Sequence, residues 1–333
     1  MKHIILFGLL AGMGISAVNA QEILPPREVK YIQTPMVHDP VMAKEGDTYY
    51  LFSTGWNVSV MSTKDLKNWS VEKDVFPSAP QWAVDKIKGY KGHTWAPDIL
   101  FHNGVYHLFY SCSTFGKNTS AIGHAYRSKL AADKGEPWTD TGEVIASQEG
   151  VSDYNAIDPN VVIDENGKPW MTFGSFWGGI KMVELTDNME KVAGDTVYTL
   201  CDRLVPDSLG HRRGVNAVEA PFIFFNDGYY YLFVSFDYCC RGLKSTYKVM
   251  VGRSDKVTGP YLDKEGRDLA AGGGSLLVAS TDDLVAIGHS SAYRFGDKCY
   301  FLAHGYSRKQ EGASVLFLKE MSFDSDGWPV LGD

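Results

Sequence analysis

An acidic residue stands beside a proline four times in this chain, at nearly equal intervals. The acids are spaced 59, 60 and 61 residues apart, in the segments His38-Asp39-Pro40, Ala96-Pro97-Asp98, Ile157-Asp158-Pro159 and Glu219-Ala220-Pro221. A fifth copy begins at Gly288-His289-Ser290, where a histidine replaces the acid. Self-similarity at a fixed period indicates a repeat architecture. If the copies are related by rotation about one axis, residues far apart in the chain meet at that axis.

Each copy predicts a β-hairpin followed by further strands. Asn103-Gly104 and Asp227-Gly228 separate apolar segments, and such pairs are favoured at the positive-φ positions of tight hairpin turns. The matching turns of the other copies are expected at 45–47, 166–167 and 296–297. A third strand is expected at 58–61, 121–126, 179–185, 248–252 and 314–319, and an aromatic residue near an outer strand closes several copies: Trp69, Trp138, Tyr261 and Trp328.

Four short strands in each of five units predict an all-β fold, a five-bladed β-propeller. A β-sandwich is the structural alternative, but it would not explain an acid at the first strand of successive repeats. Helical periodicity is weak and allows a turn or two only near 81–88 and 129–134. Two long segments, 187–218 and 255–287, are expected to be insertions that form either binding walls or plain surface.

The first twenty residues predict a secretory signal peptide. Lys2 is followed by an apolar run over 4–15 and by a small-residue ending at 17–20. That run is too short to span a bilayer, and no other stretch reaches about 18 apolar residues, so no membrane insertion is expected. We predict a signal peptide at 1–20 and a single propeller domain at 21–333, exported in soluble form to the periplasm or the outside. The net charge of −8 argues against nucleic acid as a partner.

Five cysteines leave at least one thiol unpaired in a monomer, and their spacing matches no zinc motif. Cys112 and Cys299 are expected to be buried thiols on strands. A bond between the adjacent Cys239 and Cys240 is a less favoured possibility, and Cys201 completes the set.

First strands of propeller blades line the central channel, so Asp39, Asp158 and Glu219 are expected to converge at one mouth. Like charges and partial burial should raise the pKa of at least one of these carboxyls. A protonated acid beside an ionised base is the requirement for hydrolysing a glycosidic bond. An Asp before a proline also serves as a turn former, but acids repeated across the copies favour a functional role. The acid of Asp98 follows its proline, which changes its direction and favours a structural role.

His289 breaks the acidic series. At an axial position it could orient a bound water or ligate a metal ion, and an oxygen-coordinated ion is plausible beside carboxylates. Aromatic residues near the blade mouths could stack on sugar rings or could simply fill the core: Trp95, Phe115, Phe176 and Trp177.

Together these segments resemble glycoside hydrolase family 43, and within it the endo-α-1,5-L-arabinanases. The matching stretches run from about residue 34 to 330 and include 37–40, 95–98, 155–160, 174–179, 218–221, 237–242, 245–248 and 251–261. The resemblance implies a five-bladed propeller of inverting hydrolases. It further implies that Asp39 is the general base, that Glu219 is the general acid and that Asp158 tunes the pKa of the acid.

The resemblance also implies that His289 faces a central calcium or related ion, and that the double cysteine need not signal redox chemistry. Asn160 and Ser175 lie in the matching stretches and are expected, with the four aromatic residues, to bind substrate. The expected substrate is arabinan, cleaved internally by a monomeric enzyme. The alternatives are an exo-acting α-L-arabinofuranosidase or β-xylosidase of the same family, and a propeller that binds glycans without cleaving them.

Overall fold

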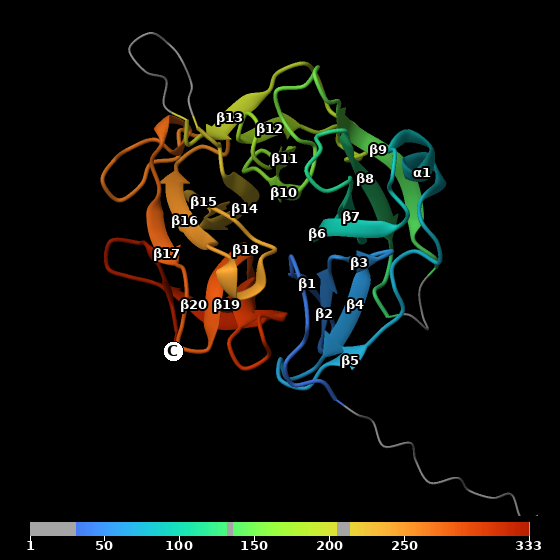
Figure 1. The fold of residues 1–333 in the computed structure, drawn as a ribbon, viewed down its shortest axis with the longest axis horizontal. Helices are drawn as coiled ribbons and strands as arrows, with labels where there is room; N and C mark the ends of the chain where they lie inside the picture. The colour runs from blue at the N-terminus through green and yellow to red at the C-terminus, as the bar shows by residue number, and fades with distance from the viewer. Residues whose placement is uncertain (1–30, 132–135, 205–213, 333) are drawn as a thin grey trace, which may run out of the picture. The chain divides into compact units, whose positions relative to one another are not determined.

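The computed structural model describes residues 31–131, 136–204 and 214–332. Five antiparallel sheets surround a central axis as the blades of a β-propeller (Figure 1), which confirms the predicted fold. The predicted signal peptide lies outside the described residues, as do the first ten residues of the predicted domain. None of the helices within the described ranges is long and apolar enough to cross a membrane.

The first two blades follow the expected order. Blade 1 consists of β1 (Val41–Glu45), β2 (Thr48–Ser53), β4 (Ser59–Thr63) and β5 (Ser70–Val71). Blade 2 consists of β6 (His93–His102), β7 (Val105–Cys112), β8 (Ser120–Arg127) and β9 (Thr139–Ser147), with the short β3 (Gly55–Trp56) paired to the start of β6. Strand β3 lies between two strands of blade 1 in the sequence, but it pairs with blade 2 and extends the inner edge of that blade.

The remaining blades have four strands each. Blade 3 contains β10 (Asn160–Ile163), β11 (Pro169–Phe173), β12 (Ile180–Glu184) and β13 (Tyr198–Cys201). Blade 4 contains β14 (Val218–Asn226), β15 (Tyr229–Phe236), β16 (Lys248–Ser254) and β17 (Ser275–Val278). Blade 5 contains β18 (Leu284–Phe295), β19 (Lys298–Ser307), β20 (Ser314–Phe323) and β21 (Pro329–Leu331).

All five predicted hairpins and third strands are confirmed. In the first turn of blade 2, Asn103 and Gly104 have φ of 50° and 85°, as a tight hairpin requires. Of the two predicted helical segments, one is α1 (Gln81–Lys86). Residues 129–131 are not helical, and 132–134 lie outside the described residues. The described part of the chain also contains two short 3₁₀ helices, η1 (Gly242–Lys244) and η2 (Leu269–Ala271).

The two long segments are not simple insertions. They carry β13 and β17, the outermost strands of blades 3 and 4, so the prediction that they are only walls or surface is wrong. Both strands have just four residues, which is too short for a clear alternating pattern. Trp69, Trp138 and Trp328 each directly precede an outermost strand, as expected. Tyr261 does not, because it lies buried between β16 and β17.

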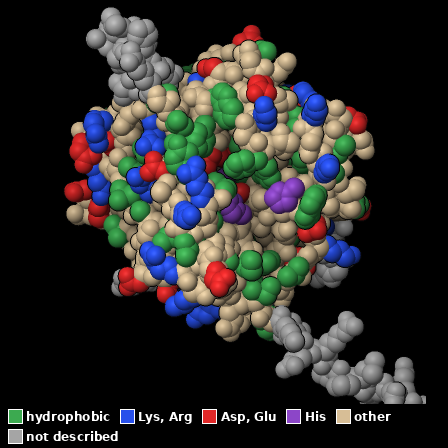
Figure 2. Space-filling view, in the orientation of Figure 1, with side chains coloured by type: hydrophobic (Ala, Val, Ile, Leu, Met, Phe, Trp, Pro, Cys, Tyr) green, Lys and Arg blue, Asp and Glu red, His purple; other side chains and the backbone are tan. Residues whose placement is uncertain are grey.

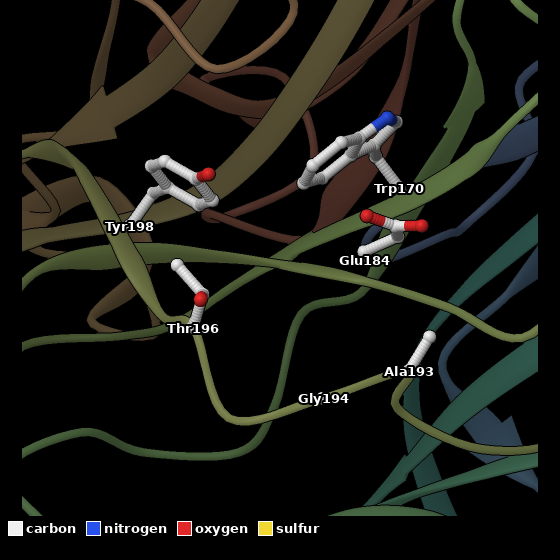
Figure 3. Close-up of a pocket in the computed structure, with 6 residues that line it drawn as sticks. All are labelled: Trp170, Glu184, Ala193, Gly194, Thr196 and Tyr198. Atoms are coloured by element: carbon white, nitrogen blue, oxygen red, sulfur yellow. The ribbon is translucent and has the colours of Figure 1, made fainter.

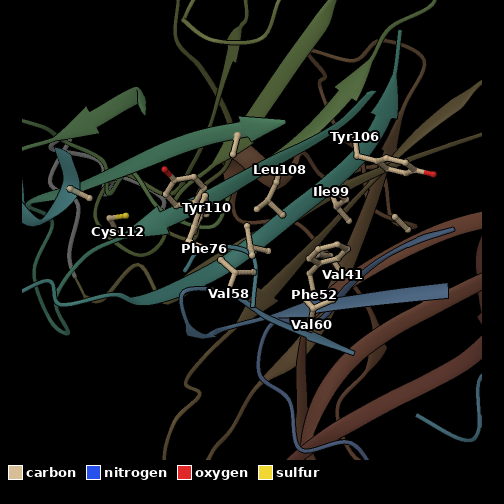
Figure 4. Packing of buried hydrophobic residues seen from close by; sticks show 14 of the residues in the cluster. Val41, Phe52, Val58, Val60, Phe76, Ile99, Tyr106, Leu108, Tyr110 and Cys112 are labelled. Atoms are coloured by element: carbon tan, nitrogen blue, oxygen red, sulfur yellow. The ribbon is translucent and has the colours of Figure 1, made fainter. Parts of the chain in front are cut away.

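Apolar side chains fill the space between neighbouring blades. Successive residues of a strand point to opposite sides, so one middle strand serves two interfaces. In β15, Leu232 and Val234 pack in the cluster shared with blade 3, whereas Phe233 packs in the cluster shared with blade 5. Figure 4 shows the corresponding cluster between blades 1 and 2, which includes Phe52 and Leu108.

The ring closes between blades 5 and 1. Leu302 of β19 and Leu51 of β2 belong to one buried cluster. The segment before β1 also binds blade 5, since the Val37 N–H donates to the Ser314 carbonyl at 3.2 Å and the Ser314 hydroxyl donates to the Val37 carbonyl at 2.5 Å. This closure holds the residues just before β1 in place at the axis.

A small pocket of about 80 Å³ lies on blade 3 beside the segment 193–198 (Figure 3). Its lining residues are Trp170, Glu184, Ala193, Gly194, Thr196 and Tyr198. None of the predicted site residues is among them, so this pocket is separate from the candidate site.

Candidate active site

One residue of each blade adopts a positive φ where the innermost strand meets the axis. These ring residues are Asp39, Ala96, Asp158, Ala220 and His289, with φ of 57°, 39°, 58°, 56° and 50°. A non-glycine residue in this region costs about 1–3 kcal/mol, and such residues cluster at functional sites. The register of β6, β14 and β18 shifts at this point, so the backbone bulges there in the same way in several blades.

The acids predicted for the site occupy different positions relative to the ring residues. Asp39 and Asp158 hold the ring position itself, and so does His289. Glu219 precedes its ring residue, Ala220, by one position. Asp98 follows its ring residue by two positions, and its predicted difference from the others is confirmed.

The N–H of each ring residue donates to a side chain of the preceding blade. The bonds are Asp39 to His304 Nδ1 (3.2 Å), Ala96 to Thr54 Oγ1 (2.8 Å), Asp158 to Ser111 Oγ (3.0 Å), Ala220 to Asp158 Oδ2 (3.2 Å) and His289 to Ser235 Oγ (2.8 Å). Asp158 is one of the predicted site residues, but the sequence analysis did not find the other four partners. Their signal is a Ser, Thr or His at or near the end of the second strand of a unit.

Asp98 and Asn160 join neighbouring blades. Buried Asp98 accepts through Oδ2 from the Val161 N–H at 2.7 Å and from the Asn160 side chain at 3.3 Å, and burial raises its pKa to about 7. Asn160 in turn accepts through Oδ1 from the Ile223 N–H at 2.8 Å. Each side chain therefore bonds a backbone group of the next blade. These contacts agree with the structural role predicted for Asp98, and they show that Asn160, which is predicted to bind substrate, is buried and bonds groups of both neighbouring blades.

Asp39 is held as an ionised carboxylate. His289 Nδ1 and His38 Nδ1 each lie 2.9 Å from its Oδ1, and the Thr54 hydroxyl donates to its Oδ2 at 2.5 Å. Burial alone would raise the pKa of Asp39, but the two histidines outweigh burial and hold this pKa well below its usual range.

The pKa of Glu219 is shifted in the opposite direction to that of Asp39. The Ser175 hydroxyl donates to Oε2 at 2.5 Å, and the buried Tyr247 hydroxyl donates to Oε1. Burial raises the pKa of Glu219 above its usual value, although both hydrogen bonds oppose this change. Ser175, predicted to bind substrate, therefore contacts this acid, and Tyr247 is a site residue that the sequence analysis missed although it lay in a matching stretch.

Asp158 and His289 complete the charge distribution. Burial raises the pKa of Asp158 to about 8, and the nearby Glu219 and Asp39 add to the rise while His289 opposes it. Burial would lower the pKa of His289, but the three carboxyls raise it to about 9. His289 is thus an imidazolium paired with Asp39. Near neutral pH the site therefore holds the ionised carboxylate of Asp39 beside the protonated carboxyl of Asp158, and the raised pKa of Glu219 shifts that group toward its protonated form.

The predicted aromatic residues lie on loops or strand ends around the axis. The Trp95 indole donates to His93 Nδ1 at 2.9 Å, and Phe115 on the β7–β8 loop is 82% exposed. Phe176 and Trp177 follow β11, and Trp177 is 41% exposed. Figure 2 shows hydrophobic side chains gathered with histidines around a hollow in the centre of one face. Trp56, which is 59% exposed and packs edge-on to His93, is a further aromatic that the sequence analysis missed.

The donor atoms around His289 permit an ion but provide few ligands. Among the described residues, the groups of three close potential ligands are His38, Asp39 and His304, and His38 with the two bonded cysteines. His289 belongs to neither group, and its Nδ1 faces Asp39. An ion at this residue would bind Nε2 and would take its other ligands mainly from water.

The cysteines partly depart from expectation. Cys112 and Cys299 are buried thiols on strands, as predicted, and Cys201 is a third. Cys239 and Cys240 form a disulfide, so the lower preference given to this bond is wrong. The conformation of the turn after β15 brings the two adjacent sulfurs together, and sequence spacing does not reveal that conformation.

Comparisons with known proteins agree with the fold. The model of the glycosyl hydrolases family 43 matches residues 32–329. The chain is 44% identical over 300 residues to the extracellular exo-α-(1→5)-L-arabinofuranosidase ArbA of Cellvibrio japonicus, covering 89% of this chain and 86% of the relative. It is 39% identical over 298 residues to the extracellular endo-α-(1→5)-L-arabinanase 1 of Bacillus subtilis, covering 88% and 87%.

Solved structures give the same result. The exo-1,5-α-L-arabinanase from a bovine ruminal metagenomic library superposes with a TM-score of 0.85 at 49% identity, covering 90% of this chain and 98% of that one. The Cellvibrio cellulosa α-L-arabinanase complexed with arabinohexaose superposes with a TM-score of 0.85 at 42% identity, covering 90% and 96%. The chain therefore belongs to glycosyl hydrolases family 43 and is a glycoside hydrolase.

Proposed function

We propose that this enzyme hydrolyses α-1,5-linked L-arabinan with inversion and cleaves internal bonds of the chain. The observation that carries the proposal is the contrast between two buried carboxyls at one axis. The pKa of Asp39 is held well below its usual range, and the pKa of Glu219 is raised. One group is thus ready to accept a proton and the other to donate one, which is the division of labour that inversion requires.

Asp39 is the proposed general base. Its carboxylate takes a proton from a water molecule, whose oxygen attacks the anomeric carbon on the face opposite the leaving group. Glu219 is the proposed general acid and gives its proton to the departing glycosidic oxygen. The bond from the anomeric carbon to that oxygen breaks as the bond to water forms, and the products are two shorter sugars.

Asp158 is the proposed modulator of the acid. Its carboxyl accepts the N–H of Ala220, the residue next to Glu219, so it fixes the backbone that carries the acid. The nearby carboxylate of Asp39 also raises the pKa of Glu219 and so favours retention of its proton. Ser175 and Tyr247 hold the two oxygens of Glu219 and orient it for proton transfer.

The relatives support arabinan as the substrate. Relatives at 44% and 39% identity are named as an arabinofuranosidase and an arabinanase acting on α-(1→5)-L-linkages, and one similar structure holds arabinohexaose. Trp95, Phe115, Phe176 and Trp177 are the proposed platforms for sugar rings.

Exo action is the second candidate. It is favoured by the names of two similar proteins, the Cellvibrio japonicus relative and the bovine ruminal structure, both described as exo-acting. Internal cleavage is favoured by the names of the Bacillus subtilis relative and of a Bacillus licheniformis endo-arabinanase structure at 42% identity.

A cation beside His289 is also proposed. Nε2 of His289 would hold it, with waters as the other ligands, and calcium is the proposed ion because the surroundings are rich in carboxyl oxygens. Such an ion supplies positive charge beside the three carboxyls. In its absence the protonated imidazole of His289 supplies that charge.

Export is proposed from residues 1–20 together with the word extracellular in the names of two relatives. Measuring the mass of the mature N-terminus after expression in a Gram-negative host tests this. Cleavage after Ala20 is expected, and an intact Met1 would contradict it.

Product analysis on linear arabinan tests the proposed activity and separates the two candidates. Internal cleavage predicts an early mixture of short arabino-oligosaccharides and a rapid fall in polymer length. Release of one product of fixed length from the start, with slow shortening of the polymer, would instead establish exo action. No release from arabinan, with a nitrophenyl xyloside hydrolysed, would replace the proposed substrate by a xyloside.

A further inference from the structure

The disulfide between Cys239 and Cys240 lies in the turn that joins β15 to β16. Cys240 is exposed and has φ of 67°, a conformation that residues other than glycine rarely adopt. Backbone and side-chain bonds hold the stem of this turn: Thr246 N–H donates to the Tyr238 carbonyl at 2.8 Å, and Arg241 N–H donates to the Ser245 hydroxyl at 3.0 Å. The disulfide spans the tip of the turn.

A chain of hydrogen bonds leads from this tip to Asp39. The Cys240 N–H donates to the Tyr306 hydroxyl at 2.7 Å, and that hydroxyl lies 3.0 Å from His38 Nε2. His38 Nδ1 lies 2.9 Å from Asp39 Oδ1. We propose that the Cys239–Cys240 disulfide is a positioning element for catalysis, which fixes Tyr306 and His38 so that Asp39 keeps the orientation of a general base. This inference rests on the proposed function of Asp39.

The donors and acceptors of the chain are mutually consistent. The Tyr306 oxygen accepts from Cys240, so its single proton is free to donate to His38 Nε2. His38 then carries its proton on Nδ1 and donates it to Asp39. The neutral ring of His304 accepts the Asp39 N–H on Nδ1, and it stacks on the His38 ring with centroids 3.7 Å apart. The Tyr306 oxygen also lies 3.4 Å from His304 Nε2, so a shift of this hydroxyl reaches Asp39 through both His38 and His304.

The contact between the sulfur and the histidine gives a second connection. Cys240 Sγ lies 3.9 Å from His38 Nε2, so the disulfide also limits the movement of the His38 ring. Because a bond between adjacent residues closes a small ring that includes their peptide bond, it restricts the backbone of both. When it opens, Cys240 can leave its unfavourable φ and withdraw its N–H from Tyr306.

Reduction supplies a direct test in the wild-type protein. Dithiothreitol gives two electrons and two protons: the S–S bond of the turn breaks, both sulfurs become thiols, and the reagent closes its own S–S bond. All five cysteines of the chain lie within the described residues, and the other three are buried thiols. Thiol titration in denaturant should therefore count three thiols before reduction and five after it.

The first experiment measures kcat and KM on linear arabinan before and after reduction. We expect kcat to fall about tenfold with KM changed less than about twofold, since small displacements of reacting groups affect the chemical step strongly. Reoxidation should restore the rate. The matched control is the variant C239S/C240S, whose lowered kcat should not respond to the reductant.

The second experiment combines C239S/C240S with Tyr306→Phe in a double-mutant cycle. If both changes act through one chain, the combined variant should lose about as much kcat as either variant alone, rather than the product of the two losses. Multiplied losses, or a kcat that stays unchanged on reduction, would overturn the proposal. A rise in KM alone would also overturn it and would make the disulfide a sugar contact. Lack of wild-type activity on arabinan would contradict the proposed function itself, which is a separate outcome.

Discussion

Blades 2 and 3 meet the axis with the same backbone but with different chemistry. In blade 2 the ring residue is Ala96 and the acid Asp98 follows two positions later, whereas in blade 3 the ring residue is Asp158 and Asn160 follows two positions later. Asp98 and Asn160 both bond the backbone of the next blade. The comparison teaches that backbone position, more than the presence of an acid beside proline, decides which side chain serves the site and which joins the blades.

The largest effect is expected from acids at the axis. Asp39→Asn and Glu219→Gln keep the shape of each side chain but remove a proton acceptor and a proton donor. Each should lower kcat on arabinan about 10³-fold or more, because general acid–base catalysis contributes about 10²–10⁴-fold. Circular dichroism and thermal unfolding serve as controls for the fold. Rates within tenfold of wild type for either variant would mean that another residue performs that role.

Matched alanine substitutions in the two blades test this comparison. Asp158→Ala should lower kcat about 10²-fold, and because it leaves the Ala220 N–H without its acceptor it should also cost about 1–3 kcal/mol of unfolding free energy. Asp98→Ala leaves the Val161 N–H without its acceptor and should cost about 1–3 kcal/mol of unfolding free energy, with kcat changed only a few-fold. Activity assays and denaturant unfolding on both variants measure the two effects. Equal loss of activity in both variants would place Asp98 in the catalytic machinery.

The pH dependence of activity sharpens the contrast between base and acid. Because Glu219 must be protonated to act, its raised pKa keeps the enzyme active toward neutral pH, and activity should decline as this group ionises. Tyr247 donates a hydrogen bond that favours the ionised form. Tyr247→Phe should therefore move the alkaline limb of kcat/KM to higher pH. An alkaline limb that moves to lower pH would contradict this account of Glu219. The limbs of the pH profile report the pKa values of the coupled carboxyls together, and not the pKa of one residue.

A pH-dependent effect is expected on stability. In the folded protein the pKa of Asp158 is raised to about 8, above its value of about 3.9 in an unfolded chain. Such a group stabilises the fold fully below its unfolded pKa, and this contribution is lost as pH rises through its folded pKa. Wild type should therefore lose stability relative to Asp158→Asn between about pH 4 and pH 8. Thermal unfolding at several pH values measures this, and a difference independent of pH would show that Asp158 is not buried as an acid.

The sequence predicted the features that depend on local chemistry. A turn such as Asn103-Gly104 predicts a hairpin from its own two residues, and the sixty-residue period predicts the blades. Five blades could therefore be inferred without a structure. The short outer strands β13 and β17 could not, because four residues give no distinct pattern and their pairing depends on β12 and β16.

The site was easiest to predict where its residues repeat along the chain. Asp39 and Asp158 stand out because the same dipeptide recurs at the axis. Tyr247 and His38 do not repeat, and their importance comes from contacts with residues distant in the chain. The sequence also does not reveal that the amide of Asn160, predicted to bind substrate, bonds the next blade.

The anomeric configuration of the first product tests the central claim most directly. Proton NMR can follow a short α-1,5-arabino-oligosaccharide during its first minutes of hydrolysis by the wild-type enzyme, before mutarotation equilibrates the reducing ends. If Asp39 activates water while Glu219 protonates the leaving oxygen, the new reducing end should appear first as the β anomer. Initial appearance of the α anomer would contradict a base and an acid acting from opposite faces of the sugar.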